Sequence, residues 1–283
     1  MTNRREFIIR AAGATSAIGL GLTACSREQK TDADPVATTP GKQHLNILIL
    51  GGTGFIGPHM VRYAQSRGHT VTLFNRGRTD ADLFPDVTTL IGDRDSQLDA
   101  LESGSWDAVI DNSGFIPRHV RESAELLSSR ANHYLFISSI SAYADLSQHG
   151  IEENFALGQL ADETDENLTG ETYGPMKALA ERYVQAAFPE GATIVRPGFI
   201  VGPGDRSDRW TYWPLRVRAG GEMIAPGAPS DPVQFIDARD LAVFVIGCLE
   251  NRTLGAFNAT GPAEPLSFGE MLETMKKAVG ANP

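Results

Sequence analysis

The chain has 283 residues, which is enough for one large α/β domain or for one domain with a smaller lobe. Its 41% hydrophobic and 21% charged residues are ordinary for a globular protein and argue against disorder through most of the chain. The formal net charge of −10 disfavours a general nucleic-acid binder, two cysteines cannot form a disulfide framework, and six scattered histidines predict no metal site.

Residues 1–25 predict an export signal that is not part of the fold. The stretch NRREFI at residues 3–8 resembles a twin-arginine motif, and the weakly apolar segment after it is too short to span a membrane in the mature protein. The stretch LTAC that ends at Cys25 resembles a bacterial lipobox, and residues 26–43 are polar, as in a flexible tether. We therefore expect an exported lipoprotein, held at a membrane through lipidated Cys25 and facing the periplasm or the cell exterior. The alternative is an ordinary amphipathic helix with a chance arginine pair.

The next stretch, residues 45–66, predicts a strand, a glycine turn and a helix. An apolar run ends at Gly51, and an amphipathic segment, Phe55–Ser66, follows at once. Gly51, Gly54 and Gly57 lie three residues apart, a spacing that allows a tight turn, close approach of a pyrophosphate and packing of the helix on the strand. The pattern favours nucleotide binding at the helix N-terminus over an ordinary glycine-rich turn.

Beyond this unit, strand and helix patterns alternate along the chain. Further strands are predicted at His69–Asn75, Val87–Ile91, Trp106–Asp111, His133–Ser138, Ala192–Arg196 and Gly255–Ala259. Helices are predicted at Pro117–Ser129, Gly174–Phe188, Asp237–Leu249 and Phe268–Val279, the third with Cys248 as a small core residue. This alternation predicts an α/β fold: a Rossmann-type doubly wound parallel sheet with a small C-terminal substrate lobe.

Two segments interrupt the alternation. Asp145–Thr172 is acidic and weakly periodic, whereas Pro203–Val233 carries three aromatic residues and four arginines (Trp210, Tyr212, Trp213, Arg206, Arg209, Arg216 and Arg218). Long irregular connections are commonly functional, so we assign both segments to a lobe over the cleft. The expected division is a nucleotide-binding domain at 44–202 and, at 203–283, the substrate lobe with the last sheet elements. The end of the chain just after a predicted helix leaves two alternatives for this lobe, a truncated one and a complete, closed one.

Candidate catalytic residues lie at the start of one predicted helix and after one predicted strand. Tyr173 and Lys177 are four residues apart and therefore share a face of the first turn, where a cation favours a phenolate. Ser138 and Ser139 lie at the end of the fifth predicted strand, at the edge of the sheet where the glycine turn also lies. The alternative is an exposed tyrosine and lysine pair on a solvated helix.

Together these features resemble the extended short-chain dehydrogenase/reductase superfamily, of the NAD-dependent epimerase/dehydratase type. The resemblance covers about residues 45 to 280 and includes Tyr143 after the serines, Arg196-Pro197-Gly198 and Phe235-Ile236-Asp237. It implies that Tyr173 is the general acid/base, that Lys177 binds the nicotinamide ribose and lowers the tyrosine pKa, and that Ser139 hydrogen-bonds the reacting oxygen. Ser138 would be the structural neighbour of Ser139.

The same resemblance implies a set of cofactor-binding residues. Asp93 would lie near the adenine, and Asn112-Ser113-Gly114 would form a backbone wall. The implied set is Gly51, Gly54, Phe55, Ile56, Gly57, Asn75, Arg76, Asp93, Asn112, Ser113, Lys177 and Pro197.

One position departs from the NAD pattern. The second strand should end in an acidic residue that binds the ribose hydroxyls, but this chain has Asn75-Arg76-Gly77-Arg78. No carboxylate there would repel a 2′-phosphate, and Arg76 or Arg78 could pair with it, so NADP is expected over NAD. The Asn-Arg-Gly stretch also resembles the subgroup related to chloroplast stem-loop-binding proteins, some of which are assigned RNA-binding roles. A non-catalytic nucleotide- or RNA-binding protein is therefore the second hypothesis.

The intact serine, tyrosine and lysine set, the acidic charge and the export signal all favour an enzyme without a nucleic-acid partner. We expect a sugar-like small-molecule substrate, an epimerase, dehydratase or dehydrogenase reaction, and a homodimer. Because no nicotinamide nucleotide pool is evident outside the cytoplasm, a redox-neutral reaction with retained cofactor, such as epimerisation, is the preferred hypothesis.

Overall fold

The computed structural model describes residues 44–280, and all of these belong to one compact unit. The export signal, lipobox and tether predicted for residues 1–43 lie outside the described residues. None of the helices between residues 44 and 280 is long and apolar enough to cross a membrane.

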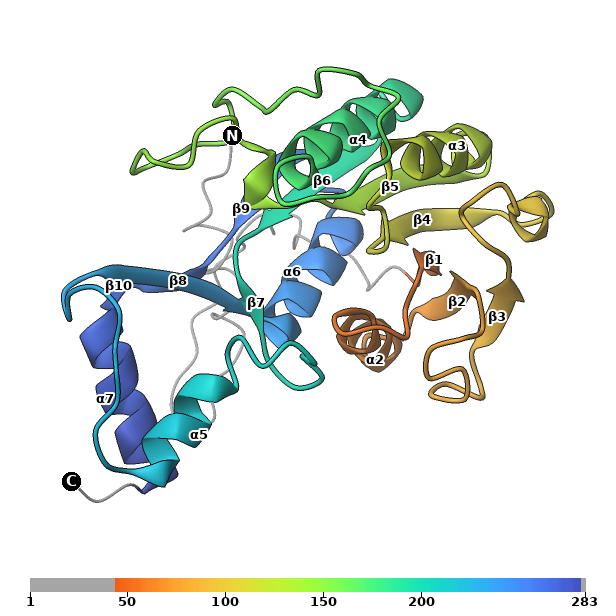
Figure 1. Cartoon of the computed structure of the whole chain (residues 1–283). Coiled ribbons are helices and arrows are strands. Elements are labelled where there is room, and N and C mark those ends of the chain that lie inside the picture. Colours follow the sequence, from red (N-terminus) through yellow and green to blue (C-terminus); the bar gives the residue numbers. More distant parts are fainter. Residues whose placement is uncertain (1–43, 281–283) are drawn as a thin grey trace, which may run out of the picture. The chain divides into compact units, whose positions relative to one another are not determined.

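A seven-stranded sheet forms the centre of this unit (Figure 1). All neighbouring strands pair in parallel, in the order β3-β2-β1-β4-β5-β6-β9, so the strand order reverses between β1 and β4. The strands are β1 (Asn46–Leu50), β2 (Thr70–Asn75), β3 (Thr88–Ile91), β4 (Trp106–Asp111), β5 (Ala131–Ile137), β6 (Ala192–Pro197) and β9 (Gly255–Ala259). The predicted Rossmann-type sheet is thereby confirmed, and its switch point lies at the glycine turn after β1.

Helices cover both faces of the sheet (Figure 1). They are α2 (Gly57–Ser66), α3 (Pro117–Leu127), α4 (Tyr173–Ala187) and α6 (Ala238–Glu250), with single 3₁₀ turns at η1 (Asp99–Leu101) and η2 (Ile140–Ala142). Ile47 and Ile49 of β1 pack in the core with α2 and α6, whereas Leu48 and Leu50 pack in the core with α3 and α4. All four side chains are fully buried, which explains why β1 is a continuous apolar run.

A second, smaller sheet has the order β10-β8-β7. Its elements are β7 (Ile200–Val201), α5 (Tyr212–Ala219), β8 (Pro232–Asp237), β10 (Gly261–Ser267) and α7 (Phe268–Val279). Trp210, Trp213 and Phe235 pack on a separate small core centred on Phe268 of α7. The sequence analysis predicted α7 but not this sheet.

The long acidic segment between Tyr143 and Tyr173 contains no helix and no strand. At its start, the Ala144 N–H donates to the Ala156 carbonyl (2.9 Å) and the Gly158 N–H donates to the Ala142 carbonyl (2.8 Å), which closes a loop. Farther along, two ion pairs attach the segment to α3 and α4: Arg118 Nε with Glu166 Oε1 (2.6 Å) and Arg182 NH1 with Glu163 Oε1 (2.8 Å).

Candidate active site

The glycine turn after β1 has the geometry that the sequence spacing predicts. Gly51 has φ +110°, and a Cβ there would lie 2.3 Å from the Asn112 Oδ1 atom. A Cβ on Gly57 would lie 2.6 Å from the Gly52 backbone, whereas a Cβ on Gly54 would meet nothing within 4 Å. Gly52, which sequence reasoning passed over, also has a positive φ of +97°. The turn therefore presents bare backbone to open space at Gly54.

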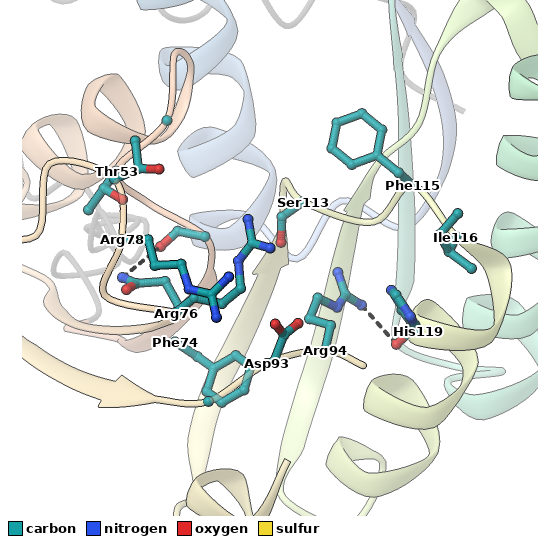
Figure 2. Close-up of a pocket in the computed structure, with 15 residues that line it drawn as sticks. Thr53, Phe74, Arg76, Arg78, Asp93, Arg94, Ser113, Phe115, Ile116 and His119 are labelled. Atoms are coloured by element: carbon teal, nitrogen blue, oxygen red, sulfur yellow. Dashed lines mark hydrogen bonds between the residues drawn. The ribbon is translucent and has the colours of Figure 1, made fainter. Parts of the chain in front are cut away.

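A cavity of about 370 Å³ lies beside this turn, at the carboxyl ends of β1 to β4 (Figure 2). Gly51, Gly54, Asn75, Arg76, Asp93 and Ser113, all from the implied cofactor set, line it. Asn75 joins the loops here, because its Oδ1 accepts from the Gly77 N–H (2.8 Å) and its Nδ2 donates to the Gly51 carbonyl (3.4 Å).

Three arginines, Arg76, Arg78 and Arg94, are among the side chains drawn around this cavity in Figure 2. Arg94 is neutralised, since its NH1 donates to the Asp111 carboxylate (2.5 Å) and its NH2 donates to the Ser123 hydroxyl (2.6 Å). No hydrogen bond or ion pair is found for Arg76 or Arg78 within residues 44–280. These two cations are therefore available to an anionic ligand.

A second cavity, of about 380 Å³, brings together Ser139, Tyr173 and Lys177. The implied cofactor residues Phe55, Ile56, Asn112 and Pro197 line this cavity as well. Ser139 is the N-cap residue of η2, and its Oγ accepts from the Ser141 N–H (3.1 Å). Tyr173 is the first residue of α4, one residue before the predicted start of this helix at Gly174, and it lies in the first turn together with Lys177.

Gly174 explains how α4 reaches η2. A Cβ at this position would lie 2.1 Å from the Ser141 carbonyl oxygen, so only glycine lets the two backbones approach this closely. This contact brings Tyr173 into the cavity that Ser139 lines, close enough for the Ser139 hydroxyl to act on the Tyr173 pKa. Sequence reasoning missed the role of Gly174, although its place directly after Tyr173 was a signal.

Lys177 is 4% exposed and points into the protein. Its Nζ donates to the carbonyls of Gly114 (2.6 Å) and Ile137 (2.9 Å) and lies 4.7 Å from the centre of the Phe136 ring. Burial lowers the pKa of Lys177 to about 8, partly offset by the Asp111 carboxylate. The ammonium is thus held by backbone oxygens at the floor of the cavity.

The expectation that Lys177 lowers the tyrosine pKa does not hold in the protein by itself. Burial raises the pKa of Tyr173 above its usual value, whereas the nearby Ser139 hydroxyl and the charge of Arg209 act in the opposite direction. The cation that acts on Tyr173 is therefore Arg209, because the Lys177 ammonium is turned toward the Gly114 and Ile137 carbonyls.

The two adjacent serines have different surroundings. The Ser138 hydroxyl donates to Glu181 Oε1 (2.5 Å), and this buried carboxylate pairs with Arg196 at 2.6 Å. Arg196 NH1 in turn donates to the Tyr143 hydroxyl (2.9 Å). Ser138 is thus committed to a buried network, which agrees with the assignment of Ser139 as the hydroxyl that faces substrate.

Two further sequence expectations concern other side chains. Cys248 is 1% exposed in the core of α6, and burial raises the pKa of its thiol to about 12, which confirms a packing role. In the part of the chain that the structure describes, no group of three or more histidine, cysteine, aspartate or glutamate side chains could hold a metal ion.

Comparison with known protein families shows to which family the chain belongs. Residues 47–259 match the model of the family described as NAD dependent epimerase/dehydratase. The chain belongs to this family. The match begins inside β1 and ends with β9, so it spans the whole seven-stranded sheet of this epimerase/dehydratase family member.

Two relatives of the chain show low sequence identity to it. The chain is 27% identical over 254 residues to a chloroplast stem-loop binding protein of 41 kDa from Arabidopsis thaliana, covering 83% of this chain and 63% of that protein. It therefore spans less than two thirds of the length of that relative. It is 26% identical over 268 residues to a 2-alkyl-3-oxoalkanoate reductase from Stenotrophomonas maltophilia, covering 84% of this chain and 76% of the reductase.

Solved structures share the fold at low identity. The Bordetella bronchiseptica enzyme WbmG, in complex with NAD and UDP, superposes with a TM-score of 0.67 at 17% identity, covering 85% of this chain and 81% of WbmG. A UDP-N-acetylglucosamine 4-epimerase from Bacillus cereus gives a TM-score of 0.66 at 20% identity, with 83% and 82% of the two chains covered.

Proposed function

We propose that this protein is an NAD(P)-dependent epimerase or oxidoreductase that acts on a sugar-like alcohol through Ser139, Tyr173 and Lys177. The observation that carries the proposal is the second cavity, where two hydroxyls and an ammonium meet beside the glycine turn. Family membership, a reductase among the relatives and epimerases among the structural neighbours agree with this chemistry.

The turn after β1 suits a nicotinamide dinucleotide. Bare backbone at Gly54 leaves room for a pyrophosphate at the N-terminus of α2, where free N–H groups favour anions. When bound, the cofactor would exchange a hydride with the carbon that carries the reacting oxygen. Arg76 and Arg78 in the first cavity favour a 2′-phosphate, so NADP(H) is the preferred form. Asn75 supports this preference, because its amide bridges two loops and carries no negative charge.

The chain supplies the proton chemistry. Burial raises the pKa of Tyr173 and so favours its protonated form, which suits donation of a proton to a carbonyl oxygen. The Ser139 hydroxyl, which lines the same cavity as Tyr173, would orient that oxygen, and Lys177 would fix the floor of the cavity through the Gly114 and Ile137 carbonyls. In the reverse direction Tyr173 would accept the proton of the alcohol while the hydride leaves the alcohol carbon for the nicotinamide.

A redox-neutral reaction such as epimerisation is the preferred form of this chemistry. It restores the alcohol carbon in the opposite configuration and needs no external oxidant. We propose it together with export, in which Cys25 anchors the protein outside the cytoplasm and the cofactor travels inside the folded protein. Purification without added nucleotide, followed by mass spectrometry of bound small molecules and of the mature N-terminus, tests both parts. An empty protein with only weak nucleotide affinity, or an unmodified Met1 in native cells, would overturn the corresponding part.

The alternative is a nucleotide- or RNA-binding protein without turnover, which the stem-loop binding relative favours. The Tyr173→Phe variant separates the two functions, since it removes the proton donor and leaves the ring in place. We expect reduction of the bound cofactor by sugars and glycosides, followed by absorbance, to slow at least about 100-fold in this variant. Equal behaviour of wild type and variant, with ligand binding retained, would favour the binding protein.

Cofactor preference has its own test. Calorimetric titration with NADP and NAD should show tighter NADP binding in the wild type. The Arg76→Asp variant should bind NAD more tightly than NADP, because a carboxylate repels the 2′-phosphate and accepts from the ribose hydroxyls. Equal or tighter NAD binding by the wild type would contradict the preference.

A further inference from the structure

The second cavity carries an unusual balance of charge. Its apolar walls come mainly from Phe55, Phe115, Ile137, Ile140, Phe199 and Ile200. Among the residues that the structure describes, two cations line it, Lys177 and Arg209, and no aspartate or glutamate does. Because the Lys177 ammonium is bonded to two backbone carbonyls, Arg209 is the cation left for a ligand.

The Arg209 side chain is held in place through its Nε atom. Its Nε donates to the Ser207 hydroxyl (2.7 Å), and Ser207 in turn donates to Asp205 Oδ1 from both its N–H (2.9 Å) and its hydroxyl (2.6 Å). The guanidinium carbon lies 4.8 Å from the centre of the Phe199 ring, a cation–π contact. The side chain is thus oriented while remaining 57% exposed at the cavity mouth.

The outer nitrogens of this guanidinium are not used. Within residues 44–280, no hydrogen bond is found for NH1 or NH2 of Arg209. Its one ion-pair partner, Asp205, stands 3.9 Å from NH2, which is too long for a hydrogen bond. The Asp205 Oδ2 atom is itself buried without a hydrogen-bond partner. Two parallel N–H donors therefore remain for a planar or tetrahedral anion.

The same guanidinium acts on the proposed proton donor. Its charge lowers the pKa of Tyr173, against the larger opposing effect of burial. Arg209 and Tyr173 also line one cavity, so an anion bound by the guanidinium would lie in the cavity that holds the phenol. A neutral sugar would find hydroxyl and amide partners there but no carboxylate to accept from its hydroxyls.

We propose that Arg209 is a specificity-determining residue that binds a carboxylate or phosphate group carried by the substrate close to its reacting carbon. This inference rests on the proposed function, because it places the substrate in the cavity of Ser139 and Tyr173. It narrows the substrate class from sugar-like alcohols to anionic ones.

Binding tests this inference without turnover. Glucose, glucuronate and glucose 6-phosphate differ only at the sixth carbon, so calorimetric titration of each into NADP-saturated protein isolates the effect of the anion. The wild type should bind at least one of the two anions about tenfold more tightly than glucose. The Arg209→Gln variant should bring that ratio close to one, and Arg209→Lys should restore only part of it.

Arg206 provides the matched control. It lies in the same loop, is 76% exposed, pairs with Asp80 at 2.6 Å and does not line the second cavity. The Arg206→Gln variant should keep the wild-type ratio. Tighter binding of glucuronate would indicate a substrate with a carboxylate, and tighter binding of glucose 6-phosphate would indicate a substrate with a phosphate.

Three results would overturn the inference. One is that neither anion binds the wild type more tightly than glucose does, and another is that the preference survives in Arg209→Gln. The third is that Arg209→Gln weakens NADP binding as much as anion binding, which would assign Arg209 to the cofactor. A further readout is the Tyr173 phenol, whose pKa should rise in Arg209→Gln, measured by ultraviolet difference titration against Tyr173→Phe. Failure of the proposed function would appear instead as unchanged turnover in Tyr173→Phe.

Discussion

Glu181→Gln is the substitution whose cost the structure defines most clearly. Glu181 and Arg196 are 1% and 3% exposed, and the carboxylate accepts from Arg196 Nε (3.0 Å), Arg196 NH2 (2.6 Å) and the Ser138 hydroxyl (2.5 Å). Glutamine has the same shape, so the substitution opens no cavity. It leaves the Arg196 charge buried without a counter-charge, and we expect the free energy of unfolding to fall by about 3 to 5 kcal/mol.

Equilibrium unfolding in urea measures this loss. The control is Arg182→Gln, which breaks the exposed pair with Glu163 and should cost about 1 kcal/mol or less, because the two side chains are 58% and 49% exposed. Replacing both Glu181 and Arg196 by methionine should recover part of the loss, since no unpaired charge is then left buried. A cost below about 1 kcal/mol for Glu181→Gln, or a double variant no more stable than the single one, would refute this reasoning.

Three further predictions concern the glycine turn, Lys177 and His133. Gly57→Ala should lower the free energy of unfolding by about 1 to 3 kcal/mol, because its Cβ would lie 2.6 Å from the Gly52 backbone. Gly54→Ala should only weaken nucleotide binding; equal behaviour of the two variants in thermal unfolding and in calorimetric titration would contradict this. Burial lowers the pKa of Lys177 to about 8 from 10.5, so between these values the unfolded chain keeps a proton that the folded protein has lost. As the pH rises through this window, the wild type should gain up to about 3 kcal/mol of stability relative to Lys177→Met. A difference in urea midpoints that does not change with pH would be contrary evidence. Burial lowers the pKa of His133 to about 4 from 6.5, so between these values only the unfolded chain takes up the proton. The stability of the wild type relative to His133→Gln should therefore fall as the pH is lowered through this window. Parallel curves of urea midpoint against pH for the two proteins would exclude the effect.

Local patterns predicted the elements of the large sheet because each strand carries its own signal. The apolar run of β1 and the glycine turn after it are contiguous in sequence, and α7 matches its predicted bounds, Phe268–Val279. The smaller sheet escaped prediction because β7 has only 2 residues and β10 contains two prolines, a composition typical of loops. No residue of α5 is fully buried, and only Trp213 and Val217 of this helix pack against the small core of α7, so its sequence carries a weak apolar stripe.

For the candidate site, residue types could be predicted but environments could not. Tyr173 and Ser139 were found from spacing and resemblance, and the structure brings them to one cavity. The orientation of Lys177 toward the Gly114 and Ile137 carbonyls depends on tertiary packing, which no spacing in the sequence reveals. Arg209 was one of four arginines in an irregular segment, and only the fold shows that it lines the cavity.

The close approach of Gly174 to the Ser141 carbonyl means that main chain, rather than side chains, sets the spacing of the two hydroxyls. The segment between Ser139 and Tyr173 leaves η2 as a loop, and the hydrogen bond from the Ala144 N–H to the Ala156 carbonyl closes the base of this loop. The interior of this loop is tied to the core through the Glu153 carbonyl, which accepts from Arg196 NH1 (3.0 Å). We expect changes elsewhere in the loop to alter the protein surface while keeping the spacing of the Ser139 and Tyr173 hydroxyls.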